Sequence, residues 1–283
     1  MFHSKIVLWL FNLQLLLCSC HKESSKSDFS KGGNFYKITS LGKLAPEVNE
    51  SSGITKSTKE TTFWTHNDSG GKPEIYEVDM HGKLLSTIHF NNIESEDWEE
   101  ITRDKNGNLY IGDIGNNSNT RRNLTIYKIN ENNPAHTEAI SFHYADQERF
   151  PPDKADKNFD CEAFFVHGDS LYLFSKNRGN DFVKMYAVPT KAGNYALLPK
   201  GQVLINAMVT GAAISPDEKT FALITYGKVV FFKIKNHVID FKHPQKCYLL
   251  AFQQSEAITF LTNNTLLVTN EQREIIKIDI EKK

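Results

Sequence analysis

The chain has 283 residues, enough for one full-sized domain with its own hydrophobic core. Hydrophobic residues make up 40% and charged residues 24%, as in a typical globular protein, and the 19 Phe and ten Tyr favour β-strands. Because the formal net charge is only −1, the chain lacks the basic excess that nucleic-acid binding requires, so we expect no nucleic-acid partner.

The N-terminus has the pattern of a bacterial lipoprotein signal. Lys5 precedes an apolar run at 6–17, which is too short to span a bilayer as a helix but has the length of a signal-peptide core. Leu17 and Ser19 place Cys20 in a lipobox, so we predict cleavage before Cys20 and its modification with acyl chains such as palmitate. The alternative is an ordinary secretory signal with incidental cysteines.

These patterns divide the chain into three parts: a signal peptide at 1–19, a flexible tether at 20–33 and a folded domain at 34–283. The tether is rich in Ser, Lys and Gly, a composition that does not build a core. We therefore expect a protein of the bacterial cell envelope, anchored through lipidated Cys20 to the inner or the outer membrane.

A repeated unit accounts for the folded domain. Five strand-like segments have similar starts, which lie 47, 63, 50 and 44 residues apart, the spacing of β-propeller blades with one longer insertion. The aligned starts are Ser52, Glu99, Glu162, Ala212 and Glu256.

Each start is followed by further strand-like segments, but the chain ends before the fifth unit is complete. The segment at 35–44 precedes the first unit and can supply the missing outer strand, which would close the ring and cover an open sheet edge. We therefore predict an all-β fold, a five-bladed β-propeller of four-stranded blades closed by an N-terminal strand. Six blades are the alternative if 146–158 hides a divergent unit, although Pro151-Pro152 and the many charges favour a long loop there.

The alignment places oxygen-bearing side chains in two rings at one mouth of the central channel. Glutamates at the inner-strand starts form one ring, and residues at the ends of the second strands form the other. Carboxylates that meet in a narrow channel repel one another unless a cation, shared protons or outward rotation relieves the repulsion. Carboxylate and amide oxygens suit Ca²⁺, so the predicted metal ligands are Asn67, Glu99, Asp113, Glu162, Glu256 and Asn270. The alternative is that these groups bind backbone or water.

Basic groups and one histidine follow the same strand ends. Lys176 and Arg178 end the second strand of the third unit, and His66 ends that of the first. Beside a bound cation, Lys176, Arg178 and His66 are candidates for holding an anionic ligand such as a phosphate or carboxylate. A solvated loop is the alternative for the basic pair, and a tight polar turn is the alternative for the segment around His66.

Four motifs resemble a group of secreted bacterial β-propellers related to the SdiA-regulated and esterase-like-phytase propellers. The motifs are Ser52-Gly53-Ile54, His66-Asn67-Asp68-Ser69-Gly70, Asp97-Trp98-Glu99-Glu100-Ile101 and Gly112-Asp113-Ile114-Gly115-Asn116-Asn117. The resemblance implies calcium on inner-strand Glu and second-strand Asn or Asp residues, which correspond to the six ligands named above. The fourth unit departs from this pattern, with Ala212 and Thr225 at those positions.

The expected function is that of an anchored, monomeric propeller that binds a small-molecule or protein ligand at its channel mouth through Ca²⁺. A first alternative is a Ca²⁺-assisted hydrolase of a phosphate ester or lactone, with Glu99, Asp113 or Glu162 as general base. A second alternative is an assembly role in the cell envelope.

Overall fold

The computed structural model describes residues 30–31, 36–250 and 254–280. The predicted signal peptide at 1–19, the lipidation site at Cys20 and most of the predicted tether lie outside these residues. In the part of the chain that the structure describes, no helix is long and apolar enough to cross a membrane.

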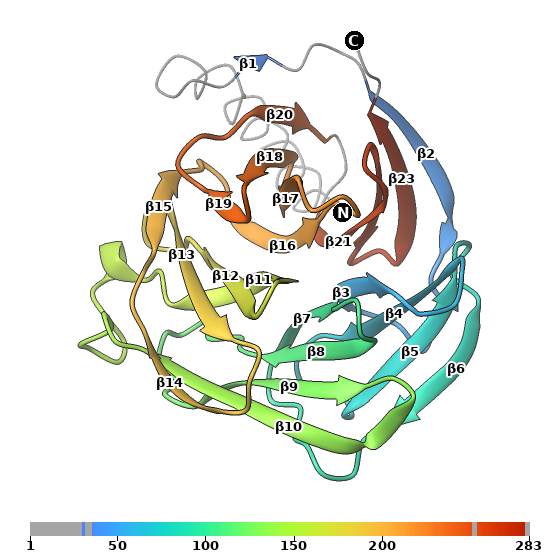
Figure 1. Ribbon diagram of the computed structural model, residues 1–283, viewed down its shortest axis with the longest axis horizontal. Coiled ribbons are helices and arrows are strands. Elements are labelled where there is room, and N and C mark those ends of the chain that lie inside the picture. The colour runs from blue at the N-terminus through green and yellow to red at the C-terminus, as the bar shows by residue number, and fades with distance from the viewer. Residues whose placement is uncertain (1–29, 32–35, 251–253, 281–283) are drawn as a thin grey trace, which may run out of the picture.

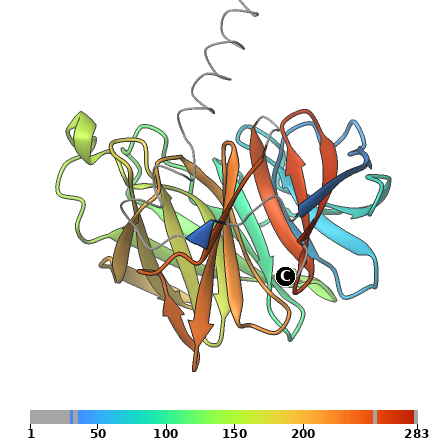
Figure 2. The same cartoon turned by 90° about the horizontal axis from the view of Figure 1, so that it is seen from above.

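Five sheets, antiparallel apart from one added strand in each of two of them, surround a central axis and form a β-propeller, as Figure 1 shows; Figure 2 gives the view turned by 90°. Blade 1 contains β3 (Ser51–Lys56), β4 (Thr62–Asn67), β5 (Glu74–Asp79) and β6 (Leu84–His89). Blade 2 contains β7 (Trp98–Arg103), β8 (Asn108–Asp113), β9 (Leu124–Asn130) and β10 (Asn133–Tyr144). Blade 3 contains β11 (Asp160–His167), β12 (Ser170–Lys176), β13 (Phe182–Pro189) and β15 (Gly201–Leu204).

Blades 4 and 5 complete the ring. Blade 4 contains β16 (Val209–Ile214), β17 (Thr220–Thr225), β18 (Lys228–Lys235) and β20 (Lys246–Leu249), with the short β19 (Val238–Asp240) beside β18. Blade 5 contains β21 (Ser255–Thr262), β22 (Thr265–Asn270), β23 (Glu274–Ile280) and β2 (Tyr36–Lys43). The predicted five-bladed fold is confirmed.

The N-terminal strand closes the ring as predicted. β2 runs antiparallel to β23, with Tyr36 opposite Ile280 and Lys43 opposite Glu274, so the outer edge of β23 is covered (Figure 1). Within the predicted tether, β1 (Ser30–Lys31) pairs in parallel with β20 of blade 4.

The segment at 146–158 is a loop, as the sequence indicates, and holds a single 3₁₀ turn at Lys154–Asp156. The described residues therefore contain no sixth blade. The connection between β13 and β15 was not predicted to form a strand. It contributes β14 (Gly193–Leu197), which crosses to blade 2 and pairs in parallel with β10.

The core is divided among the blade junctions. Five buried apolar clusters lie one at each junction between neighbouring sheets. At the junction of blades 3 and 4, the rings of Phe165 and Phe221 lie 5.2 Å apart, and Phe221 stacks on Phe232 at 4.8 Å. Because both faces of each sheet are covered, the inner strands are buried along nearly their whole length, and their starts are held in fixed positions.

Candidate functional site

The five inner strands share one irregularity, a β-bulge at the second or third residue. Each inner strand contacts the inner strands of its two neighbours, and the ring closes between β21 and β3. In each blade the register slips by one residue at the start of the inner strand, which leaves one residue outside the ladder. The five bulged residues are Ser52, Glu99, Glu162, Thr210 and Glu256.

The predicted alignment of inner strands is thus correct for four blades and wrong for the fourth. Thr210, not Ala212, is the counterpart of Ser52, because β16 begins at Val209 and bulges between Val209 and Gly211. The hydroxyl of Thr210 donates to the backbone carbonyl of Ser255 in blade 5 at 2.6 Å. In the same way, the hydroxyl of Ser52 donates to the backbone carbonyl of Glu99 in blade 2 at 2.9 Å. In blade 4 a hydroxyl that binds the next blade therefore replaces a carboxylate.

The second predicted ring is aligned as expected, but its side chains bind groups in their own blades or the adjacent loops. Asn67 donates to the carbonyl of Glu47 at 2.9 Å, and Asn270 donates to the carboxylate of Glu274 at 2.9 Å. Asp113 accepts from Arg121 at 2.9 Å and from the backbone amide of Asp97 at 3.0 Å. The position of Asp113 therefore fixes the backbone at Asp97, and a metal role for these three residues stays a prediction.

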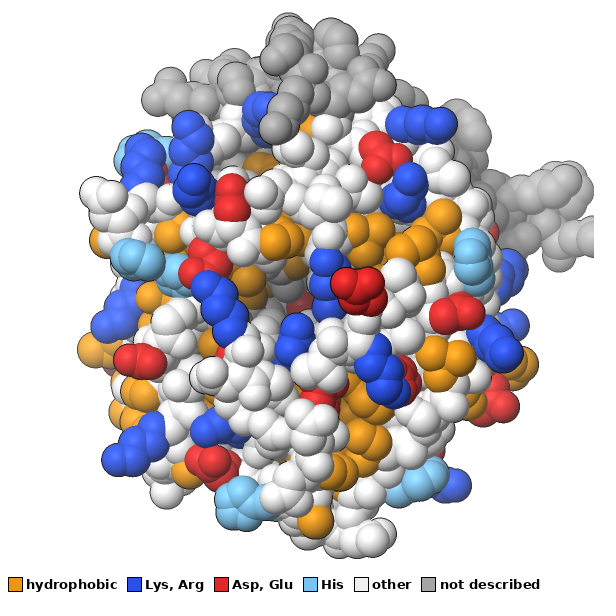
Figure 3. Space-filling model, turned by 45° about the vertical axis from the view of Figure 1, so that its right-hand side comes forward, with side chains coloured by type: hydrophobic (Ala, Val, Ile, Leu, Met, Phe, Trp, Pro, Cys, Tyr) orange, Lys and Arg blue, Asp and Glu red, His pale blue; other side chains and the backbone are white. Residues whose placement is uncertain are grey.

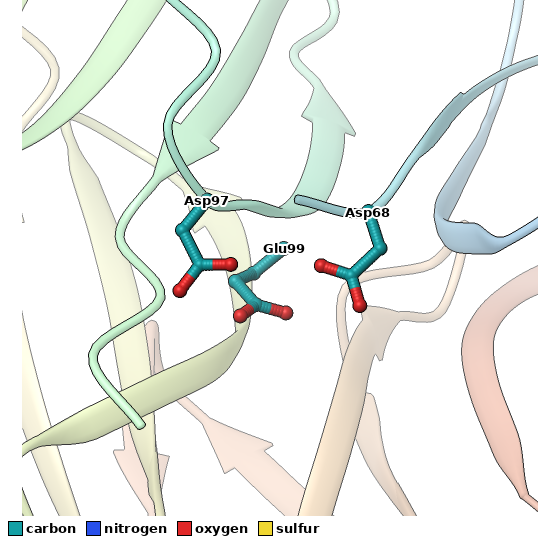
Figure 4. Close-up of side chains that lie close together, drawn as sticks. All are labelled: Asp68, Asp97 and Glu99. Atoms are coloured by element: carbon teal, nitrogen blue, oxygen red, sulfur yellow. The ribbon is translucent and has the colours of Figure 1, made fainter. Parts of the chain in front are cut away.

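Three carboxylates meet where blades 1 and 2 adjoin, as the close-up in Figure 4 shows. Asp68 follows β4, Asp97 precedes β7 and Glu99 is the bulged residue of β7. One oxygen from each lies within 4.8 Å of the others. We call this set the carboxylate trio.

A glycine makes room for the trio. A Cβ atom on Gly115 would lie 2.2 Å from the Cγ of Asp97 and 2.3 Å from an oxygen of Glu99, which is closer than real Cβ contacts come. The amide of Gly115 donates to the carbonyl of Asp97 at 3.1 Å, so the glycine backbone is pressed against the site. Any other residue at position 115 would force the carboxylates apart.

A second acidic group lies beside the trio in blade 3, but it is neutralised. Glu99 also approaches Asp160 and Glu162. Lys176 forms an ion pair with Glu162, and Arg178 pairs with Asp160 at 2.5 Å and with Glu162 at 3.2 Å. Lys176 and Arg178, predicted to hold a ligand, thus already offset two carboxylates of the mouth.

Burial and mutual repulsion act on the acids of the mouth. Burial, with the nearby charge of Asp68, raises the pKa of Asp97 to about 6. Burial, together with Glu162 and Asp68, raises the pKa of Glu99 well above its ordinary value. Burial and Glu162 likewise raise the pKa of Glu256 to about 9, and its carboxylate accepts from the hydroxyl of Tyr226 at 2.8 Å. Ionisation of these groups therefore costs free energy that a bound cation would offset.

His66 lies beneath the mouth and is fully buried. Its ring meets that of Trp98 edge-on at 5.7 Å, and Nδ1 lies 2.9 Å from the carbonyl of Asn67. Burial lowers the pKa of His66, so its neutral form is favoured. In this position His66 packs between blades 1 and 2, and a ligand role remains a prediction.

Glu100 is not among the predicted site residues, yet its side chain spans the channel. One oxygen accepts from the amide of Ile101 at 3.0 Å, and the other accepts from Ala212 of blade 4 at 3.0 Å. The side chain is fully buried, which raises the pKa of Glu100 well above its ordinary value. The signal in the sequence was a second acid in an inner strand, where apolar or small residues are expected. Glu100 ties blade 2 to blade 4 below the trio.

One family model and many solved structures match this chain. The family model described as SdiA-regulated matches residues 34–210, and a search of curated proteins gave no match. Among solved structures, the PQQ-bound form of aldose sugar dehydrogenase from Streptomyces coelicolor is similar, with 11% identity and a TM-score of 0.51, over 87% of this chain and 98% of that one. The β-propeller domain of Cps50 (Swd1) from Myceliophteria thermophila has 8% identity and a TM-score of 0.48, over 87% of this chain and all of the other. At such identities, structural likeness concerns the fold alone.

Proposed function

Because the chain belongs to the SdiA-regulated family, and its channel mouth holds the carboxylate trio, we propose that this propeller is a binding protein that holds Ca²⁺ at the mouth. The observation that supports this proposal is the trio itself. Asp68, Asp97 and Glu99 converge on one point from two blades. Within the described residues, none of the three forms an ion pair with a basic side chain.

The chemistry of the trio fits a hard cation. Ca²⁺ takes six to eight oxygen ligands at about 2.3 to 2.6 Å, and carboxylates are its usual protein ligands. Three carboxylates leave the remaining positions to water or to oxygens of a ligand. Zn²⁺ fits less well, because the trio contains no His or Cys.

The neighbouring cations indicate what would bind beside the metal. The Arg178 side chain is 28% exposed, whereas that of Lys176 is 7% exposed. Arg178 can therefore meet an anionic group that reaches the metal, while Lys176 balances Glu162 behind it. We propose a ligand with a phosphate or carboxylate group that bridges Ca²⁺ and Arg178.

A Ca²⁺-assisted hydrolase of a phosphate ester or lactone is the second candidate. The observation in its favour is that burial and the neighbouring acids raise the pKa of Glu99 above its ordinary value, which makes its carboxylate a stronger base. Asp113 is less suited to this role, because Arg121 and two backbone amides already hold its carboxylate. Under this proposal, turnover of model phosphate esters or lactones requires Ca²⁺ and is lost in Glu99→Gln.

Membrane attachment through lipidated Cys20 remains part of the proposal. It rests on the sequence pattern at 6–20. The chain is expected in the membrane fraction of cells, and Cys20→Ser should release it. Unchanged membrane association of Cys20→Ser would exclude the lipid anchor.

Thermal melting of the purified protein tests the calcium proposal. Ca²⁺ should raise the Tm, since a ligand that binds only the folded state stabilises it, by about 2.7 kcal/mol at a hundredfold excess over Kd. Asp97→Asn should abolish the rise. The matched control is Asp153→Asn, which removes a carboxylate that is 74% exposed, pairs with Arg149 and does not belong to the trio. Equal rises in the wild type and Asp97→Asn would mean that Ca²⁺ binds elsewhere.

A further inference from the structure

The inner strands end at a second mouth, on the opposite side of the channel from the carboxylate trio. A cavity of about 680 Å³ opens there, a volume within the usual range for small-molecule sites. Its floor is apolar and includes Ile101, Ala212 and Ile258. Glu100 lies between this floor and the trio, because its carboxylate accepts from the backbone amides of Ile101 and Ala212. The two mouths are therefore separate sites.

Two cations from neighbouring blades line this cavity at the last residues of β3 and β7. The ammonium of Lys56 donates to the carbonyl of Leu261 at 2.6 Å, and within the described chain it has no carboxylate partner. Arg103 approaches Glu131 at 3.7 Å and makes no closer hydrogen bond among the described residues. Burial, with the repulsion of Arg103, lowers the pKa of Lys56. An anion placed between the two side chains would relieve that repulsion.

A buried histidine lines the cavity, and one of its two ring nitrogens has no hydrogen bond to a described residue. His167 is only 6% exposed, and its Nδ1 has no hydrogen-bond partner in the structure. The nearest carboxylate oxygen, of Glu218, is 3.8 Å away, beyond hydrogen-bond distance, and Glu218 already pairs with Lys105 at 2.8 Å. The ring stacks on His237 at 5.8 Å. A buried ring nitrogen without a partner is costly, so it points to a polar ligand group in the cavity.

Three threonines add hydroxyls at equivalent positions. Thr55, Thr102 and Thr259 each lie three residues after the bulged residue of their blade, and all three line the cavity. None of their hydroxyls makes a hydrogen bond to another described residue. The wall thus offers more donors than the two oxygens of a carboxylate can use, whereas a phosphate group has three free oxygens.

We propose that this second mouth binds a small phosphomonoester, with its phosphate between Lys56 and Arg103 and the rest of the molecule against the threonines and His167. Two acids at this mouth are already engaged, and a third, Asp169, is exposed in the turn between β11 and β12. Asp104 accepts from Asn106, Asn108 and Tyr110, and Glu218 pairs with Lys105. The carboxylate of Glu131 lies 3.7 Å from Arg103 and accepts from the indole of Trp64, so it competes with the phosphate for Arg103, whereas Lys56 has no carboxylate partner among the described residues.

Calorimetric titration of the purified protein with glycerol 3-phosphate tests this site. The titration is done in EDTA, so that binding through Ca²⁺ at the other mouth does not contribute. Saturable binding is expected, and Lys56→Gln and Arg103→Gln should each weaken it at least about tenfold, as expected for loss of a charge-assisted contact. Lys72→Gln is the matched control, because its side chain is 83% exposed and does not line the cavity.

Three outcomes would overturn the proposal. They are the absence of binding at millimolar glycerol 3-phosphate, binding unchanged by Lys56→Gln, and equally tight binding of succinate, which would assign the site to carboxylates. Melting curves establish that each variant is folded. If Arg103→Gln fails to fold because it loses Glu131, Lys56→Gln alone decides the result.

Discussion

At the scale of single residues, Gly115 determines whether the carboxylate trio can form. Gly115→Ala should destabilise the protein by about 1 to 3 kcal/mol, as overpacking does, and should abolish the rise in Tm with Ca²⁺. The added methyl would occupy the space of Asp97 and Glu99. Melting curves with and without Ca²⁺ measure both effects.

Gly71→Ala provides the control, since its Cβ would lie no closer than 3.5 Å to another atom, an ordinary contact. If Gly115→Ala responds to Ca²⁺ like the wild type, the trio does not hold the ion.

Glu256 should make stability depend on pH. Its pKa is raised from 4.5 to about 9, so the folded protein retains a proton that the unfolded chain releases between these values. Stability should therefore fall as the pH rises through this window, by up to about 1.4 kcal/mol per pH unit, or about 3 to 6 °C in Tm. Glu256→Gln keeps an acceptor for Tyr226 but has no proton to lose. The Tm of the wild type relative to this variant should fall between pH 5 and 8, and parallel curves would contradict the assignment.

At the scale of elements, Glu100 couples inner strands across the channel. Glu100→Ala would leave the buried amides of Ile101 and Ala212 without their acceptor, at about 1 to 3 kcal/mol for each group. The expected drop in Tm is about 4 to 24 °C, and urea unfolding should give a matching loss of free energy. Glu94→Ala, at an exposed position before β7, is the control. A Tm within about 1 °C of the wild type would show that water replaces the carboxylate without cost.

The closing strand β2 can be tested by deletion. A chain that lacks residues 1–43 loses β1 and β2 and exposes the edge of β23, whereas a chain that lacks residues 1–29 keeps both strands. The longer deletion should lower the Tm by about 10 °C or more and cause aggregation, because the unpaired edge is long and largely apolar. Light scattering and melting curves compare the two. Equal behaviour would mean that the ring holds without β2.

The strands of each blade could be predicted from the sequence more fully than the contacts between blades. Five blades and the closing strand followed from repeat spacing and from the missing outer strand. β14 was missed because its partner, β10, belongs to another blade, and no local pattern reveals that pairing. In blade 4 the small residues around Gly211 carry no charged marker, so the alignment slipped by two residues and missed Thr210.

The residues of the carboxylate trio were also only partly predicted, because their approach depends on contacts between blades. Glu99 and Glu162 were found because they recur at equivalent positions, and the structure brings them together with Asp160. Asp68 and Asp97 lie in loops just outside the aligned strands, so periodicity did not select them, although both stand in the motifs that indicated the family. Their convergence depends on how blades 1 and 2 pack.

At the scale of the whole molecule, the propeller holds two unlike mouths on one channel. The first is acidic and lies at the inner-strand starts, and the second is lined by Lys56, Arg103 and His167 at their ends. Over the face in Figure 3, acidic and basic side chains are interspersed, in keeping with the net charge of −1. Recognition should therefore depend on the two mouths rather than on the field of the whole surface.

Crystals of the protein grown with Ca²⁺ test the proposed metal site most directly. Anomalous diffraction should show a peak at about 2.3 to 2.6 Å from one oxygen each of Asp68, Asp97 and Glu99, and no peak in crystals of Asp97→Asn. A fully occupied Ca²⁺ ion elsewhere on the chain, or none at millimolar Ca²⁺, would contradict the proposal.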